Sequence, residues 1–203
     1  MRIKRLLAAR GIHYLATRFG PSWLRSMAFD EKYRRGDWNF HSDGAELPLI
    51  VSRYLRGGDL LMLGCGSASL LDSLEAPAFA SVLGVDLSEE ATRLASRIRR
   101  QNIAFQVGDM LRFQPPKQYD VVLFSESLYY VPATQQVEML NRYAARLKAG
   151  GVIIVTFAQV TRYEDIIERV RGNFLMIEDR AFTGATRHLL VFQAKPDRPA
   201  AAG

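Results

Sequence analysis

The chain has 203 residues, 48% of them hydrophobic, which is enough for one domain with a full core and a short accessory segment. Its single cysteine, Cys65, excludes an intramolecular disulfide and favours a reducing, cytoplasmic location, and no Cys/His cluster has metal-ligand spacing. The formal net charge of +6 comes from residues 1–41, where nine Lys and Arg face three acidic residues, so the rest of the chain is neutral.

The basic N-terminal segment contains apolar residues at roughly helical spacing, at Ile3, Leu6, Leu7, Ile12 and Leu15. This pattern predicts an amphipathic helix over 2–18. Arg10, Gly11 and His13 interrupt the apolar run, so we expect no signal peptide, and no run approaches the ~18 residues that cross a membrane. Packing on the domain is favoured over contact with an anionic membrane, a partner protein or nucleic acid.

The remaining sequence alternates between helical and strand patterns. Helices are predicted over 21–35, 44–55, 67–74, 88–100, 133–148 and 161–171, with Gly150 and Gly151 ending the fifth. Strands are predicted over 59–63, 81–85, 103–107, 119–124, 151–157, 173–180 and 187–194. Turn residues between the last two strands predict an antiparallel hairpin.

This alternation predicts an α/β fold with a seven-stranded, mostly parallel sheet covered by helices on both faces. We expect three parts: a basic helical arm and lid over 1–43, one domain over 44–195 and a flexible tail over 196–203. A dinucleotide oxidoreductase would continue as a second βαβαβ half, so the architecture disfavours NAD.

Two glycines, Gly64 and Gly66, follow the first predicted strand, and Asp86 ends the second strand twenty residues after Gly66. Glycines let the backbone turn tightly and approach a ligand without a Cβ in the way. In a right-handed βαβ unit both strand ends reach the same sheet edge, so the carboxylate can bind a ribose whose other end rests on the glycine turn. The spacing predicts a nucleoside site.

Over roughly residues 45 to 194 these motifs resemble class I S-adenosylmethionine-dependent methyltransferases, whose glycine motif reads acid-x-Gly-x-Gly-x-Gly. Gly64 and Gly66 match, whereas Met62 replaces the acid and Ala68 the third glycine. The family acid helps hold the methionine amine of the cofactor, so backbone carbonyls, water or another side chain must do so here. We expect Ala68 to be a mild change in helical backbone. The resemblance implies a Rossmann-like fold and S-adenosyl-L-methionine as cofactor, with S-adenosyl-L-homocysteine as product.

The resemblance also assigns cofactor-binding residues. Asp86 would bind the ribose and Leu87 would pack beside the adenine, while Asp109 would accept a hydrogen bond from the adenine amino group and Met110 would contact the ring. Cys65 would be a small residue packed in the turn. Without a ligand, Asp86 would be a strand-end or helix-capping residue and Asp109 a turn aspartate.

After the fourth predicted strand, the loop Ser125-Glu126-Ser127-Leu128-Tyr129-Tyr130 would lie beside the transferred methyl group, with Ser125 touching the cofactor. It lacks the Asn/Asp-Pro-Pro-aromatic tetrad of enzymes that methylate nucleic-acid bases. It resembles small-molecule enzymes instead, including the nodulation-type group that N-methylates an amino sugar of a chitin oligosaccharide. Glu126 could deprotonate or hold the acceptor, or bond to loop amides. Tyr129 and Tyr130 could contact ligand or only pack.

Upstream, Tyr33 and Trp38 lie in a segment that resembles the aromatic lid of the same small-molecule group. Aromatic rings suit a sulfonium because they add area and a cation–π attraction. Anchoring of the arm to the core would explain them equally well. His41 could act as a base, although a structural role is favoured.

The sequence therefore predicts methyl transfer from S-adenosylmethionine to a small-molecule amine or hydroxyl, with a sugar or glycan precursor as the leading acceptor. Glu126, Tyr130 and His41 are the candidate catalytic residues. One alternative is an RNA or protein methyltransferase that docks its substrate on the basic arm. Another is a non-catalytic, cofactor-binding subunit in which Met62 reflects decay of the site.

Overall fold

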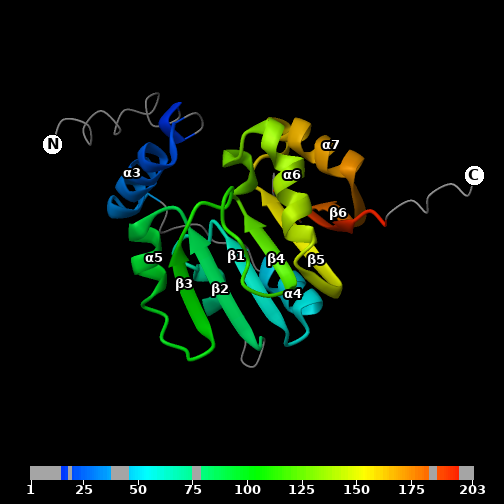
Figure 1. Ribbon diagram of the computed structural model, residues 1–203, viewed down its shortest axis with the longest axis horizontal. Coiled ribbons are helices and arrows are strands. Elements are labelled where there is room, and N and C mark those ends of the chain that lie inside the picture. Colours follow the sequence, from blue (N-terminus) through cyan, green and yellow to red (C-terminus); the bar gives the residue numbers. More distant parts are fainter. Residues whose placement is uncertain (1–14, 18–19, 38–45, 75–78, 183–186, 197–203) are drawn as a thin grey trace, which may run out of the picture.

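A computed structural model describes residues 15–17, 20–37, 46–74, 79–182 and 187–196. Its seven-stranded sheet has the order β3-β2-β1-β4-β5-β7-β6. The strands are β1 (Asp59–Leu63), β2 (Ser81–Asp86), β3 (Ile103–Val107), β4 (Tyr119–Ser125), β5 (Leu147–Phe157), β6 (Phe174–Ala181) and β7 (His188–Ala194). Strands β1 to β5 are parallel, while β7 runs antiparallel to both β5 and β6 (Figure 1). The predicted parallel sheet and C-terminal hairpin are confirmed.

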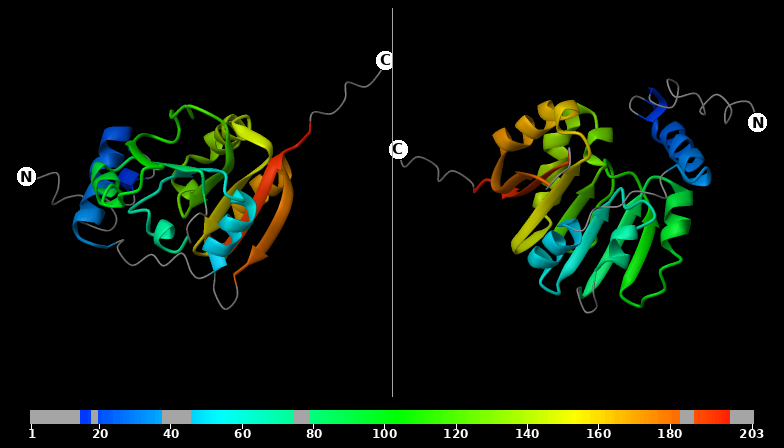
Figure 2. Two further views of the ribbon diagram at one scale, coloured as in Figure 1. Left: turned by 90° about the horizontal axis from the view of Figure 1, so that it is seen from below. Right: turned by 180° about the vertical axis from the view of Figure 1, so that it is seen from behind.

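Helices cover both faces of the sheet (Figure 2). The α-helices are α3 (Ser22–Arg34), α4 (Glu46–Leu55), α5 (Glu89–Ala95), α6 (Ala133–Ala144) and α7 (Glu164–Asn173). Successive strand residues face opposite cores: Leu60 packs in the cluster that includes α4, and Leu61 in the cluster that includes α6 and α7. Burial on both faces explains why the central strands read as continuous apolar runs.

The carboxyl ends of the parallel strands meet at one sheet edge, and helix α3 lies next to this edge beside α5 (Figures 1 and 2). Asp30 of α3 joins the two helices, because its Oδ1 accepts hydrogen bonds from Ser88 Oγ at 2.6 Å and from the backbone N–H of Glu90 at 3.1 Å. Ser88 is the N-cap of α5, and its Oγ accepts from the N–H of Ala91. The segment predicted as arm and lid therefore packs, through α3, against the helix that follows β2.

The helices predicted over 67–74 and 88–100 are shorter than expected. The pattern over 67–74 forms only a short 3-10 helix, η1 (Ser69–Asp72), because Gly66 and Ala68 take left-handed backbone and delay helix entry. The helix predicted over 88–100 ends at Ala95, followed by the charged run 97–100, in which only Ile98 is apolar.

The helix predicted over 133–148 is also wrong at its end, since α6 stops at Ala144 and β5 begins at Leu147. Lys148 explains the early strand, because its Nζ bonds to Asp59 at 2.7 Å and to Asp120 at 2.8 Å at the amino edge of the sheet. Gly150, with φ 77°, lies inside the strand rather than at a helix stop.

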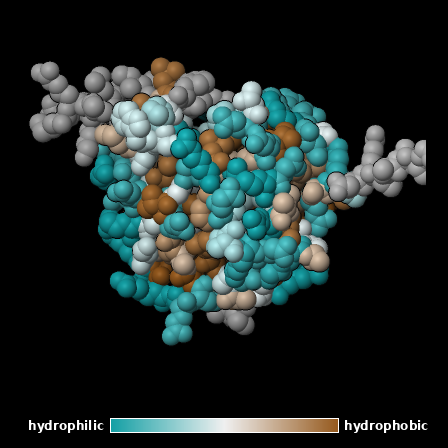
Figure 3. Space-filling view, viewed as in Figure 1, coloured by the Kyte–Doolittle hydropathy of each residue, from teal (hydrophilic) through white to brown (hydrophobic). Residues whose placement is uncertain are grey.

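Among the described residues, no helix is long and apolar enough to cross a membrane. The face seen in Figure 3 is mostly hydrophilic, with apolar surface gathered over β2 and β3. Most of the predicted basic helix over 2–18, the lid residues 38–43 and the tail 197–203 lie outside the described residues.

Candidate functional site

The turn after β1 needs residues without a Cβ at two positions, Gly64 and Gly66. Gly64 and Gly66 have φ of 69° and 56°, in the left-handed region. A Cβ on Gly66 would lie 2.7 Å from Tyr33 Oη, and one on Gly64 would lie 2.5 Å from Ser127 Cβ. The turn is tied to β2, because the N–H of Gly64 donates to the carbonyl of Val85 at 2.8 Å. Both glycines are thus required by conformation and by the approach of neighbouring side chains.

Asp86 ends β2 and is buried beside this turn. Its Oδ2 accepts from the N–H of Gly66 at 2.9 Å, and its Oδ1 accepts from the N–H of Ser88 at 2.8 Å. Burial raises the pKa of Asp86 to about 6, although the hydrogen bonds from Ser88 and Gly66 favour the ionised carboxylate. The carboxylate therefore shapes the glycine turn while it faces the pocket.

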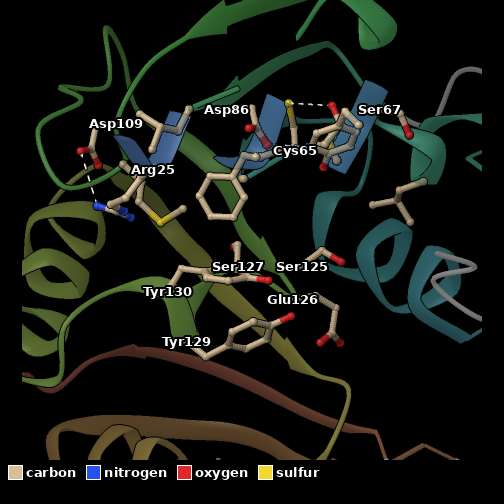
Figure 4. A pocket seen from close by; sticks show the side chains of 18 of the residues that line it. Arg25, Cys65, Ser67, Asp86, Asp109, Ser125, Glu126, Ser127, Tyr129 and Tyr130 are labelled. Atoms are coloured by element: carbon tan, nitrogen blue, oxygen red, sulfur yellow. Dashed lines mark hydrogen bonds and ion pairs between the residues drawn. The ribbon is translucent and has the colours of Figure 1, made fainter. Parts of the chain in front are cut away.

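A pocket of about 930 Å³, including its open mouth, occupies this edge of the sheet. In Figure 4 Asp109 and Arg25 lie at one end and Glu126 at the other, with Asp86 between them. Predicted residues in its lining are Tyr33, Met62, Gly64, Cys65, Gly66, Asp86, Leu87, Asp109, Met110, Ser125, Glu126, Tyr129 and Tyr130. Trp38 and His41 lie outside the described residues.

Helix α3 contributes Arg25, Phe29 and Tyr33 to the pocket. They are four residues apart and so share one face of the helix. The ring of Phe29 meets that of Tyr130 edge to face, with centroids 5.0 Å apart. Burial, and secondarily the Asp86 carboxylate, raise the pKa of Tyr33 well above its ordinary value, so its hydroxyl stays neutral. Sequence reasoning found Tyr33 but missed Arg25 and Phe29, which the four-residue spacing could have indicated.

Asp109 follows β3 and, besides a turn bond, makes contacts to α3 that the sequence did not indicate. Its Oδ1 accepts from the N–H of Leu111 at 3.0 Å, and its Oδ2 accepts from Ser22 Oγ at 2.7 Å. Arg25 Nη1 lies 3.8 Å from the same Oδ2. The carboxylate thus anchors the start of α3 as well as lining the pocket.

The loop after β4 has an unusual backbone at Glu126, whose φ is 52°. A left-handed glutamate is strained and persists only where its surroundings fix it, as at many functional sites. Here the N–H of Glu126 donates to Thr156 Oγ1 at 3.2 Å, and Ser127 Oγ donates to the carbonyl of Leu63 at 2.7 Å. These bonds hold the loop against β5 and β1 and leave the Glu126 side chain in the pocket lining.

Tyr129 and Tyr130, in the short 3-10 helix η2 (Leu128–Tyr130), form a wall beside Glu126, to its left in Figure 4. Tyr129 stacks on Tyr163, with centroids 4.3 Å apart and an interplanar angle of 4°. Burial raises the pKa of both Tyr129 and Tyr130 well above the ordinary value. Both phenols are therefore neutral near pH 7 and can donate hydrogen bonds, but they do not serve as bases there.

Three further predicted positions can now be judged. The expectation of helical backbone at Ala68 is wrong, because this residue has φ 59° and ψ 31°, a left-handed conformation that an alanine adopts at a cost. Met62, which stands where the family motif has an acid, is buried in β1 and lines the pocket. Burial raises the pKa of Cys65 well above its ordinary value, so it is an uncharged thiol packed in the turn.

The residues present fit an adenosyl cofactor. Left-handed glycines leave room beside the turn, a buried carboxylate stands at the end of β2, and Leu87 and Met110 add apolar wall. Within the described part of the chain, no group of three or more His, Cys, Asp or Glu residues could hold a metal ion.

Comparison with known proteins agrees with this geometry. Residues 60–151 match the family model described as a methyltransferase domain. Nodulation protein S of Azorhizobium caulinodans is 22% identical over 147 residues, which are 69% of this chain and 71% of that protein.

Solved structures share the fold. The N-methyltransferase NodS from Bradyrhizobium japonicum WM9, in complex with S-adenosyl-L-homocysteine, has a TM-score of 0.63 and 18% identity, covering 96% of this chain and 97% of that one. Magnesium protoporphyrin IX methyltransferase from Synechocystis PCC 6803, with the same product bound, has a TM-score of 0.64 and 16% identity over 86% of this chain and all of that one. In both sequence and fold the chain is similar to class I S-adenosylmethionine-dependent methyltransferases.

Proposed function

We propose that this enzyme methylates an amine or hydroxyl of a small molecule, with an amino sugar or glycan precursor as the leading acceptor. The observation that carries the proposal is the Glu126 carboxylate, which lines the pocket beside Tyr129 and Tyr130 on strained backbone. Similarity to Nodulation protein S and to the N-methyltransferase NodS favours an amine as the acceptor.

When bound, S-adenosylmethionine supplies an electrophilic methyl group and leaves as a neutral thioether. The acceptor nitrogen or oxygen supplies the electron pair that forms the new bond to carbon as the carbon–sulfur bond breaks. Glu126 would orient the acceptor and take the proton that the nitrogen or oxygen gives up. The neutral hydroxyl of Tyr130 would donate a hydrogen bond to the acceptor, and the aromatic wall would exclude water.

A charged sugar amine suits this end of the pocket for electrostatic reasons. An ammonium group is attracted by a carboxylate in a poorly hydrated site, and a sugar ring packs well on tyrosine faces. An ammonium cannot attack a methyl group until it loses a proton, so the same carboxylate that binds the acceptor would also activate it. A hydroxyl acceptor would need the second role only.

The proposal is tested by measuring release of S-adenosylhomocysteine with glucosamine oligomers that carry a free amine and with their fully N-acetylated forms. We expect turnover only with the free amines. Glu126→Gln should lower kcat about 10²- to 10⁴-fold, the usual contribution of a positioned general base. Its affinity for S-adenosylhomocysteine should change by less than about threefold, because a partner of the acceptor leaves cofactor binding intact.

Glu138→Gln is the matched control, since Glu138 lies on the exposed side of α6. Turnover by this variant should equal that of the unaltered enzyme. Equal turnover by Glu126→Gln would overturn the role of Glu126. Failure on all small amines and hydroxyls, with transfer to RNA that falls steeply as salt rises, would overturn the small-molecule acceptor.

A further inference from the structure

We propose that Arg25 is a specificity-determining residue for the cofactor, donating a hydrogen bond from Nε to a ring nitrogen of adenine. The inference rests on S-adenosylmethionine as cofactor and not on the identity of the acceptor. Arg25 projects from α3 into the pocket lining at the end where Asp109 lies (Figure 4).

The Nε atom of Arg25 carries the first observation. The residue is only 6% exposed, and its Nε has no hydrogen-bond partner among the residues that the structure describes. A buried N–H donor without a partner destabilises the folded protein, because it has lost its hydrogen bond to water. Because α3 already packs on the pocket through Phe29 and Tyr33, an apolar residue at position 25 would make the protein more stable, unless a ligand accepts a hydrogen bond from Arg25 Nε.

The order of the strand ends places the adenine next to this donor. The ribose is expected at Asp86, at the end of β2, and the glycine turn that follows β1 lies on one side of it. Strand β3 and Asp109 lie on the other side. A nucleoside whose methionine part rests on the glycine turn must therefore extend its base toward Asp109 and Arg25.

The charges at this end suit a neutral base better than an anion. Arg25 Nη1 lies 3.8 Å from Asp109 Oδ2, so the arginine charge is largely balanced, and a phosphate or carboxylate would face the aspartate. Adenine offers what this pair can bind, because its 6-amino donor stands beside ring acceptors N1 and N7. Asp109 would accept from the amino group while Arg25 Nε donates to one of those nitrogens.

The position of the cation is also compatible with a positively charged cofactor. Asp109 and Arg25 lie at the far end of the pocket from Glu126 (Figure 4). The sulfonium lies between ribose and methionine, so Arg25 stays at the adenine end, where it does not oppose the cofactor charge closely.

The test compares S-adenosylhomocysteine with its 1-deaza and 7-deaza analogues, in which a ring nitrogen is replaced by C–H. Dissociation constants are measured by calorimetry for the unaltered protein and for Arg25→Met, which keeps the apolar stem without any N–H. The unaltered protein should bind one of the two analogues about 10- to 100-fold more weakly than S-adenosylhomocysteine, the effect of losing a bond to a charged donor. Arg25→Met should bind that analogue and S-adenosylhomocysteine about equally.

Ser22→Ala is the matched control. It removes another α3 contact to Asp109 and lies outside the pocket lining, so it should keep the preference against that analogue. Arg25→Lys retains a charge beside Asp109 but misplaces the donor, and it should lose the preference even if Arg25→Met is unstable in thermal unfolding. If Arg25 only anchors α3, both Arg25 variants will weaken all three ligands equally, and this result would overturn the proposal. Absence of any binding to the unaltered protein would instead refute the cofactor.

Discussion

We expect the affinity for S-adenosylhomocysteine to fall as the pH drops through about 6, because of Asp86. Burial raises the pKa of this carboxyl to about 6 in the cofactor-free protein. Ribose hydroxyls that donate to the carboxylate would stabilise its ionised form and lower the pKa in the complex. Binding below this pH therefore requires loss of a proton, and acid competes with the ligand.

The magnitude follows from one titrating group. With a pKa of about 6, Asp86 is protonated in roughly 90% of molecules at pH 5 and 10% at pH 7, so the affinity should be about tenfold lower at pH 5. Calorimetry in buffers of different ionisation enthalpy measures the same effect as protons released. We expect about 0.9 proton per ligand at pH 5 and about 0.1 at pH 7.

Folding of the cofactor-free protein should show the opposite trend. The pKa of Asp86 is raised from 3.8 in the unfolded chain, so its contribution to stability is full below pH 3.8 and is lost as the pH rises through 6. The loss is of order 3 kcal/mol for a shift of this size. Asp86→Asn should bind weakly and abolish both trends. Equal affinity at pH 5 and 7, or an unchanged slope in Asp86→Asn, would refute the reasoning.

Three further substitutions test the turn and the helix that covers it. Gly66→Ala should weaken S-adenosylhomocysteine binding at least about tenfold in calorimetry, because its Cβ would lie 2.7 Å from Tyr33 Oη and its φ is 56°. Ala68→Gly should raise the free energy of unfolding in urea by about 1 kcal/mol, since glycine takes the left-handed φ of 59° freely. Asp30→Ala should lower that free energy by about 1–3 kcal/mol, because Ser88 Oγ loses its buried acceptor; no change would contradict the role of Asp30.

The strands and their order of appearance could be predicted from the sequence. The predictions over 59–63 and 103–107 agree with β1 and β3 at both ends. Short apolar runs bounded by glycines, charges and turn residues leave little freedom in placing such strands. Asp86 and Asp109 could be placed at the pocket because parallel strands bring their carboxyl ends to one edge of the sheet.

Features that depend on contacts distant in sequence could not be predicted. Lys148 is drawn into β5 by Asp59 and Asp120, and the helical periodicity of its own segment gave no sign of these partners. The left-handed backbone at Ala68 follows from the turn around Gly66, where an alanine would ordinarily favour a helix. Local propensity yielded to tertiary packing in both cases.

Asp86 and Asp109 each make hydrogen bonds within the protein and also line the pocket. Truncating either side chain therefore changes stability and ligand affinity at the same time. Asp86 fixes the N–H of Gly66, and Asp109 fixes Ser22 at the start of α3. Replacing either carboxylate by alanine will leave buried donors without acceptors, so stability and affinity will fall together. Replacing one atom of the ligand leaves the hydrogen bonds within the protein in place. Changing the pH by two units alters only the proton on the Asp86 carboxyl group. Those perturbations separate the binding role of each carboxylate from its structural one.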